Sequence, residues 1–332
     1  MSHSAPQKVL LSGGKQAGGI ESFARALQLG FTELGIEAEV ISPREVFRRP
    51  RQLRDPQVLK ILSTTAVFAA PLARRAVSMA HGFPCAANQG WPRTLGVLAS
   101  YKLATRSAGS QLVVVSDYSA LHLRSIFNLR VDAVIRNPML PLFSEPHDPS
   151  VQREAITYVG RLHEAKNVHK LLPAIRDVLD QHPGLSAWII GDGAQRSMLQ
   201  ALVSDDPRIT FPGALSPLAV RDRLRRTRVF VSANPTEPFG IVYLEALSQG
   251  CVVAMPASGG GLEIAPDQIG KSICLFPSSI ERAEVAATIE LALRQTPAPP
   301  SLRAYSATAV AKAYLSRDAH FSSRGIFEAP SR

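Results

Sequence analysis

Residues 232–263 constrain the fold of this chain more than any other stretch. The pattern there predicts the end of a buried strand, a loop that carries Glu237, a helix that opens near Phe239 and Gly240, and a second apolar strand over Cys251–Met255. A strand, a helix and a further strand in this order indicate a parallel α/β sheet. Because ligands of such sheets bind beyond the carboxyl ends of the strands, we expect a binding site at Glu237 and Gly240.

Two carboxylates lie near this expected edge, Glu237 in the loop and Glu245 in the second turn of the helix. The free backbone N–H groups of the helix start could bind a phosphate or a sugar oxygen. One carboxylate could then bind a sugar and the other a ribose. A purely structural interpretation stays open here, with Glu237 as a helix cap and Glu245 as a solvated side chain.

The surrounding residues resemble the retaining glycosyltransferases of family GT4. The signature of that family, E-x-F-G-x-x-x-x-E-A-x-x-x-G, is present here from Glu237 to Gly250. Three further segments are similar and occur in the expected order: GG-x-E at Gly18, G-R-L…K at Gly160, and G-D-G at Gly191. The resemblance therefore spans nearly the whole chain. One departure is Ala-Asn-Pro-Thr at 233–236, where the family usually has Pro-Ser before the first glutamate.

The resemblance implies the GT-B fold class, α/β, with two Rossmann-like domains whose parallel sheets face each other across a cleft. We predict an N-terminal acceptor-binding domain over 1–137 and a linker over 138–154. A nucleotide-sugar-binding domain would cover 155–298, and a C-terminal helix within 299–332 would return to the first domain. A chain of 332 residues is long enough for two domains that each bury a core.

Four residues match positions that the family uses in catalysis, namely Glu237, Arg161, Lys166 and His81. A departing nucleoside diphosphate gains negative charge, so fixed cations beside it lower the barrier. Arg161 could bind phosphate oxygens in a fork, and Lys166 could act as a movable point charge. Glu237 would bind a sugar hydroxyl and favour positive charge at the anomeric carbon. His81 would reach the donor hexose, although a histidine at a strand end could also simply be packed there.

The resemblance also implies a set of donor-binding residues. They are Gly18, Gly19, Phe239, Gly240, Ile241, Glu245, Gly191 and Leu215. Gly18 and Gly19 have no side chains and would let the backbone approach a diphosphate closely. Glu245 would accept hydrogen bonds from the ribose, and Gly191 and Leu215 would border the nucleobase. The sequence contains no Asp-x-Asp, so we expect no metal and no cofactor besides the nucleotide-sugar co-substrate.

The N-terminal strand–helix–strand unit disfavours a nicotinamide dehydrogenase. Its glycines at 13–19 do not have the G-x-G-x-x-G spacing, and no acid follows the second strand at Ser42. The next segment is harder to interpret. Thr65–Ala69 and Val77–Ala80 are predicted as buried strands, and Ala87–Arg93 as a polar loop whose tryptophan could bind an acceptor sugar.

The net charge of +10 indicates anionic partners. Arginines cluster at 44–54, at 74–75 and at 221–228. The first two clusters could lie on anionic lipid headgroups, and a solvated basic face is the alternative. No motif combines these cations with interleaved aromatic residues, so we do not expect a nucleic acid as partner.

The expected location is the cytoplasm, with the protein peripheral on the inner face of a membrane. No apolar run reaches the roughly 18 residues that a membrane-spanning helix needs, and the first residues do not resemble a signal peptide. The three cysteines, Cys85, Cys251 and Cys274, are too widely spaced for a disulfide framework or a metal site.

Together these features predict a metal-independent hexosyltransferase. It would move a hexose from a nucleotide-diphosphate sugar to a lipid-linked or polysaccharide acceptor, such as lipopolysaccharide or exopolysaccharide. Retention of the anomeric configuration is implied by the resemblance alone. Two alternatives stay open: an enzyme of the same fold with a small soluble acceptor, and a non-catalytic protein that binds a nucleotide or a polyanion.

Overall fold

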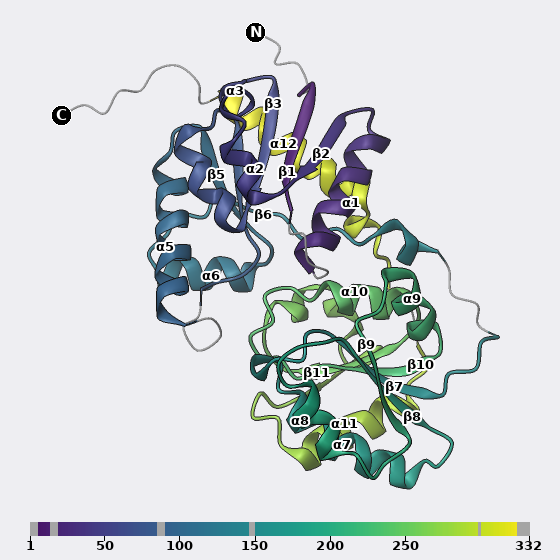
Figure 1. The fold of residues 1–332 in the computed structure, drawn as a ribbon. Helices are drawn as coiled ribbons and strands as arrows, with labels where there is room; N and C mark the ends of the chain where they lie inside the picture. The colour runs from purple at the N-terminus through teal and green to yellow at the C-terminus, as the bar shows by residue number, and fades with distance from the viewer. Residues whose placement is uncertain (1–5, 14–18, 85–89, 146–149, 298–299, 324–332) are drawn as a thin grey trace. The chain divides into compact units, whose positions relative to one another are not determined.

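The structure is a computed structural model that describes residues 6–13, 19–84, 90–145, 150–297 and 300–323. The chain divides into two compact units (Figure 1). Unit 1 comprises Met1–Leu140 and Arg303–Arg332, and unit 2 comprises Pro141–Leu302. Each unit contains a six-stranded sheet, and all strand pairs are parallel. The predicted α/β class with two Rossmann-like sheets is confirmed.

The sheet of unit 1 has the strand order β2-β1-β3-β4-β5-β6. Its strands are β1 (Lys8–Ser12), β2 (Glu37–Ile41), β3 (Val58–Ser63), β4 (Ala76–Ala80), β5 (Ser110–Val114) and β6 (Ala133–Val134). The helices are α1 (Gly19–Glu33), α2 (Pro43–Phe47), α3 (Pro50–Arg54), α5 (Trp91–Arg106), α6 (Asp117–Ser125) and α12 (Ala307–Ser323), with the 3-10 helices η1 (Thr64–Leu72) and η6 (Arg303–Tyr305).

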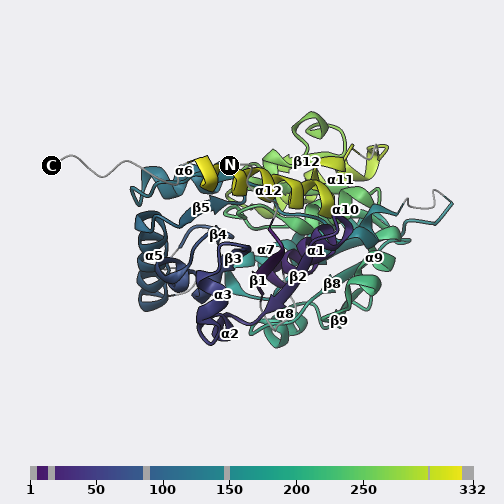
Figure 2. The same cartoon turned by 90° about the horizontal axis from the view of Figure 1, so that it is seen from above.

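Two layers of helices cover this sheet. Because side chains alternate along a strand, Leu10 of β1 joins the core under α2, α3, η1 and α5, whereas its neighbours Val9 and Leu11 are buried against the other face. Helices α1 and α12 pack together on that other face, where Tyr314 of α12 donates its hydroxyl to the sulfur of Met79. Figure 2 shows α12 on one side of the strands and α2 and α3 on the other.

The contact between α1 and α12 depends on a glycine. A Cβ atom on Gly30 would lie 2.2 Å from the carbonyl oxygen of Ala307. Only a residue without a side chain permits this approach. The C-terminal helix therefore completes the core of unit 1, and the backbone N–H of Met139 donates to the carbonyl of Tyr305 just before this helix.

The predicted strand at Thr65–Ala69 is wrong, because this apolar run lies within the 3-10 helix η1. A short apolar run fits a buried strand or a buried helical turn equally well. The strand of this region is β3, whose pattern is interrupted by Lys60. Lys60 is nevertheless fully buried, because its ammonium donates to the carbonyls of Asp55 (2.5 Å) and Arg74 (2.6 Å).

The predicted polar loop at Ala87–Arg93 is only partly described. Residues 85–89 lie outside the described residues, and Trp91 already begins α5, with Pro92 in its first turn. Proline suits the start of a helix, since its missing N–H would have no partner there. The prediction of a loop at Trp91–Arg93 is therefore wrong.

The sheet of unit 2 has the order β12-β11-β10-β7-β8-β9. Its strands are β7 (Ala155–Val159), β8 (Ser186–Ile190), β9 (Ile209–Gly213), β10 (Thr227–Val231), β11 (Val252–Pro256) and β12 (Ile273–Phe276). The helices are α7 (Val168–Gln181), α8 (Arg196–Leu202), α9 (Pro217–Arg225), α10 (Ile241–Ser248) and α11 (Arg282–Arg294), with 3-10 helices η2 (Pro141–Ser144), η3 (Glu164–Lys166), η4 (Gly260–Glu263) and η5 (Pro266–Gln268). Helices α7, α8 and α11 bury one core face, and α9 and α10 lie on the opposite side (Figure 1).

Candidate active site

The strand order of unit 2 reverses between β7 and β10. From β7 the chain proceeds outward to β8 and β9, and then returns to place β10 on the other side of β7. In a doubly wound sheet the connections on the two sides of such a switch point leave toward opposite faces, and a crevice opens at the carboxyl ends of the two strands. The segments that begin at Gly160 and Ser232 follow these two strands directly.

Lys166 and Glu237 meet beyond the carboxyl ends of β7 and β10. The Lys166 ammonium donates to Oε2 of Glu237 at 2.6 Å, and the side-chain amide of Asn234 donates to the same oxygen at 2.8 Å. Both charged side chains are mostly buried, with 23% of Lys166 and 19% of Glu237 exposed. Burial alone would raise the pKa of the Glu237 carboxyl, but Lys166, the hydrogen bond from Asn234 and the charge of Arg161 together lower it. Glu237 is therefore ionised at neutral pH.

Arg161 lies in the same segment as Lys166 and differs from it in two respects. Its side chain is exposed, and it forms no ion pair with any residue in the described part of the chain. Its charge still acts on Glu237 and on the buried hydroxyl of Tyr158, which donates to the Arg161 carbonyl at 3.1 Å. The site thus holds one paired and one unpaired cation.

Two asparagines for which the sequence predicted no role stabilise these segments: Asn167 joins one to the other, and Asn234 orders the loop that carries Glu237. Asn167 has a left-handed backbone (φ 52°), and its side-chain amide donates to the carbonyl of Ala233 at 3.1 Å. The Asn234 side-chain oxygen accepts from the backbone N–H and the hydroxyl of Thr236, which leaves its amide for Glu237. The N-P-T-E sequence after an apolar strand was a usable signal, because Asn forms such turns with the backbone two residues later.

Glu245 lies on α10 and is 8% exposed. Burial raises the pKa of its carboxyl to about 8, and among the described residues no side chain forms an ion pair or hydrogen bond with this carboxyl. The interpretation of Glu245 as a solvated residue is therefore wrong. The cap interpretation of Glu237 is also wrong, because the residue at the N-cap of α10 is Gly240.

Gly240 needs to be a glycine for two reasons. Its φ of +89° lies in the left-handed region, and a Cβ atom there would lie 2.5 Å from the ring of Tyr243. That ring is buried, and its hydroxyl donates to the side chain of Ser232 at 2.9 Å. Phe239 is buried and Ile241 is the first residue of α10. The helix start is thus fixed against the end of β10.

The loop after β8 packs on the loop after β7. A Cβ atom on Gly191 would lie 1.8 Å from the carbonyl oxygen of Gly160, and the Gly191 N–H donates to the Gly213 carbonyl at 2.9 Å. Half-buried Leu215 follows β9, just before the N-cap of α9 at Ser216. Gly191 and Leu215 thus follow two neighbouring strands at the same edge of the sheet as Arg161.

The remaining predicted residues belong to unit 1. Gly18 lies outside the described residues, and Gly19 is the first residue of α1. His81 directly follows β4, and its ring lies edge-on to Phe23 at 4.6 Å between centroids. Its buried Nε2 has no hydrogen-bond partner among the described residues, and burial lowers its pKa to about 4. His81 is therefore a neutral imidazole at physiological pH.

Comparison with known proteins identifies the family. Residues 142–308 match the family described as "Glycosyl transferases group 1". The chain belongs to this family. The match includes every candidate site residue of unit 2 in this group 1 family member, from Arg161 to Glu245, and leaves out nearly all of unit 1.

Individual relatives agree with this assignment. The chain is 30% identical to the sulfoquinovosyl transferase SQD2 of Arabidopsis thaliana over 178 residues, which is 52% of this chain and 34% of that protein. The alignments with the curated relatives thus span about a third of their length. Among solved structures, Anabaena Alr3699/HepE in complex with UDP and glucose has a TM-score of 0.68 at 17% identity, with 96% of this chain and 97% of that chain covered.

The fold likeness extends over both units of the group 1 family member. WaaG, a glycosyltransferase involved in lipopolysaccharide biosynthesis, has a TM-score of 0.67 at 13% identity and covers 96% of this chain and 95% of its own. At such identities the likeness shows the fold alone, and it confirms the predicted GT-B fold class.

The described residues contain neither a candidate metal centre nor a candidate membrane-spanning helix. No group of three or more His, Cys, Asp or Glu side chains in the described ranges could hold a metal ion. Among the described helices, none has both the length and the apolar character that crossing a membrane requires.

Proposed function

We propose that this protein transfers a hexose from a nucleoside-diphosphate sugar to a lipid-linked or polysaccharide acceptor, with retention of the anomeric configuration. The observation that carries the proposal is the ion pair between Lys166 and Glu237 at the β7/β10 switch point. Membership of the group 1 family and the likeness to a structure with bound UDP and glucose support it.

The two cations of the site would stabilise the leaving diphosphate. Arg161 is exposed and without an acidic partner in the described chain, so its guanidinium can bind phosphate oxygens in a fork. Lys166 would exchange Glu237 for the diphosphate as negative charge develops there during bond cleavage. With two cations and the N–H groups at the start of α10, the proposed reaction needs no metal ion.

Glu237 would act on the transferred sugar. Its lowered pKa keeps it ionised, so it can accept a hydrogen bond from a sugar hydroxyl and favour positive charge at the anomeric carbon. Because the acceptor hydroxyl would attack the face from which the diphosphate leaves, the configuration is retained. That stereochemistry rests on the GT4 resemblance.

The ribose and base of the donor would bind farther along the same edge. Glu245 is a buried carboxyl with no partner among the described residues, which suits a group that accepts hydrogen bonds from ribose hydroxyls. Gly191 and Leu215 would border the base. In unit 1, Gly18 and Gly19 would lie against the donor phosphates. His81 would offer the sugar a neutral hydrogen-bonding imidazole.

The acceptor class is proposed from the relatives. WaaG is described as involved in lipopolysaccharide biosynthesis, and LpsE of Rhizobium meliloti (strain 1021), 32% identical over 116 residues (34% of this chain and 32% of that protein), as acting in lipopolysaccharide core biosynthesis. A protein that extends such a glycan would act at the cytoplasmic face of a membrane.

The test is transfer by the purified chain. The protein is incubated with a panel of UDP-, GDP- and ADP-hexoses and lipid-linked or water-soluble acceptors, with and without EDTA. We expect transfer that EDTA does not abolish, a product that partitions with lipid, and an anomeric proton signal of the same configuration as the donor. A product found only with soluble acceptors would favour the alternative enzyme. Binding of donors without any transfer would favour a non-catalytic role.

A further inference from the structure

Unit 1 carries all of the net positive charge of the chain. Counted on the sequence, unit 1 has 22 Lys and Arg against 10 Asp and Glu, a net charge of +12. Unit 2 has 15 Lys and Arg against 17 Asp and Glu, a net charge of −2, and the two values add to the +10 of the whole chain. An anionic partner would therefore be attracted to unit 1.

The arginine clusters differ in how they are paired. In the cluster at 221–228, Arg221 pairs with Glu145 at 2.5 Å, Arg226 pairs with Glu154, and Arg228 donates to two backbone carbonyls. These cations stabilise unit 2 itself. In contrast, five exposed arginines of unit 1 form no side-chain hydrogen bond or ion pair with any residue that the structure describes. They are Arg44, Arg48, Arg51, Arg54 and Arg74.

Large apolar side chains are exposed on the same layer of unit 1. Phe47 at the end of α2 is 46% exposed, and Phe68 and Leu72 of η1 are 38% and 53% exposed. Helices α2 and α3 both pack against η1, and the N–H of Arg74 donates to the Leu53 carbonyl of α3. The unpaired arginines and the apolar side chains therefore come from elements in mutual contact.

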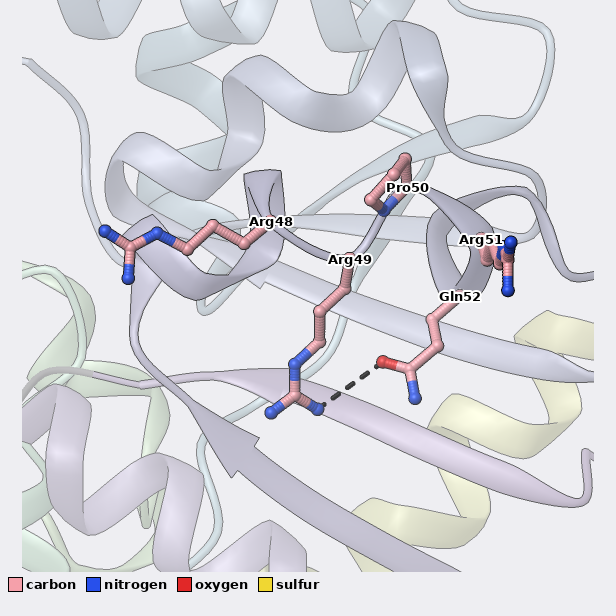
Figure 3. Close-up of a pocket in the computed structure, with 5 residues that line it drawn as sticks. All are labelled: Arg48, Arg49, Pro50, Arg51 and Gln52. Atoms are coloured by element: carbon pink, nitrogen blue, oxygen red, sulfur yellow. Dashed lines mark hydrogen bonds between the residues drawn. The ribbon is translucent and has the colours of Figure 1, made fainter.

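The turn between α2 and α3 forms a shallow depression of about 400 Å³ (Figure 3). It is lined by Arg48, Arg49, Pro50, Arg51 and Gln52. Arg49 is held by Glu39 at 2.7 Å and by Gln52 at 3.4 Å, whereas Arg48 and Arg51 point away from each other on the two sides of it. Both residues line the depression, and neither guanidinium group has a partner among the described residues, so each is available to an anionic headgroup.

We infer that α2, α3 and η1 form a docking surface for an anionic lipid bilayer. This docking surface consists of Arg44, Arg48, Arg51, Arg54 and Arg74 together with Phe47, Phe68 and Leu72. The guanidinium groups bind lipid phosphates, and the three apolar side chains insert at the boundary between headgroups and acyl chains. A nucleic acid would match the arginines but would leave the exposed Phe47 and Leu72 in water. The inference goes beyond the proposed function, since it concerns a surface outside the crevice and needs neither donor nor acceptor.

The test is cosedimentation of the full chain with vesicles. Vesicles of phosphatidylglycerol and phosphatidylcholine are compared with vesicles of phosphatidylcholine alone, at low and high salt. We expect binding to the anionic vesicles only, and about tenfold or greater weakening in Arg48→Glu/Arg51→Glu, because each cation near the surface adds about 1 kcal/mol and 1.4 kcal/mol is tenfold in affinity. Phe47→Ser/Phe68→Ser should lose the part of the binding that persists at high salt, where charge attraction is screened.

The matched control is Arg303→Glu/Lys312→Glu. Both cations are exposed and belong to unit 1, but they lie on η6 and α12, away from the α2–α3–η1 layer. The control therefore changes the charge of unit 1 by the same amount as Arg48→Glu/Arg51→Glu, outside the docking surface. The control should change vesicle binding by less than about twofold, because screening limits charge effects to roughly 8–10 Å.

Equal weakening in both variants would overturn the inference in favour of a general charge effect. Absence of binding to anionic vesicles would overturn it directly. So would binding of duplex DNA with the same arginine dependence and no effect of the phenylalanine variant on vesicles. None of these outcomes bears on transfer activity with soluble donor and acceptor, which tests the proposed function separately.

Discussion

The ammonium nitrogen of Lys166 lies 2.6 Å from Oε2 of Glu237, although 71 positions separate the two residues in the chain. They meet because β10 returns to pair with β7, so that the segments after these strands leave from adjacent carboxyl ends. The pair stabilises the ionised form of the mostly buried Glu237 carboxyl, because Lys166 lowers the pKa that burial alone would raise. It also holds a movable cation at the place where we propose that diphosphate leaves.

Replacement of this lysine tests the proposed role directly. In Lys166→Ala, kcat should fall about 100- to 1000-fold, as expected when one group that stabilises developing charge is lost. The control is Lys170→Ala on the adjacent α7, an exposed lysine whose ammonium donates to the Ser279 carbonyl. Its kcat should stay within about twofold of wild type. Steady-state kinetics with the preferred donor measure both, and similar values in the two variants would remove Lys166 from the mechanism.

The buried Glu245 makes stability fall as pH rises. Its folded-state pKa is about 8, above the ordinary value of 4.5, so between these values the folded protein binds more protons than the unfolded chain does. The free energy of unfolding then decreases with rising pH through this window, by about 1.4 kcal/mol for each pH unit when the shift is fully expressed.

Glu245→Gln should remove this dependence, because the amide carries no charge at any pH. We expect equal melting temperatures of variant and wild type near pH 4.5 and a higher melting temperature of the variant at about pH 9. The control Glu281→Gln changes an exposed glutamate at the N-cap of α11 and should leave the dependence as in wild type. Parallel curves for Glu245→Gln and wild type would show that this carboxyl titrates normally.

The same carboxyl should couple donor binding to proton release. If its ionised form accepts hydrogen bonds from the ribose, binding favours ionisation, and affinity for the correct sugar nucleotide rises with pH by up to about tenfold per unit below pH 8. Sugar nucleotides have no phosphate that titrates in this range. Calorimetry in two buffers of different ionisation enthalpy measures the released proton. In Glu245→Gln the affinity should be lower and independent of pH, and an unchanged proton release there would assign the coupling to another group.

The close approach of α1 and α12 predicts opposite effects for two glycine substitutions. Gly30→Ala places a Cβ 2.2 Å from the Ala307 carbonyl oxygen, so the helices must separate. We expect a loss of about 1–3 kcal/mol in the free energy of unfolding of unit 1, as for overpacked cores. Gly96→Ala on α5 meets nothing within 4 Å and should instead stabilise the protein. The expected gain is about 0.4–1 kcal/mol, because alanine restricts the unfolded chain. Thermal melts should show a lower melting temperature than wild type for Gly30→Ala and a higher one for Gly96→Ala. The prediction fails if Gly30→Ala melts at or above the wild-type temperature.

The periodic segments of this protein were predictable from the sequence. The strands predicted at Val77–Ala80 and Cys251–Met255 are present as β4 and β11, each within one residue of the predicted bounds. The segment around η1 was not predictable in the same way. Its apolar run fits a strand or a helical turn, and the charged Lys60 concealed the real strand, since only the folded chain supplies the two carbonyls that bind its ammonium.

The sequence by itself determined the alternation of strands and helices, the glycines at strand ends, and the residue types around Glu237 that resemble one family. Only the tertiary structure decided that β10 lies beside β7, that Lys166 reaches Glu237, and that Glu245 is buried and not solvated. The preference of a segment for strand or helix depends on residues within a few positions, so the sequence alone can predict it. Burial and ion pairing depend on segments that are distant in sequence, and strand order brings those together.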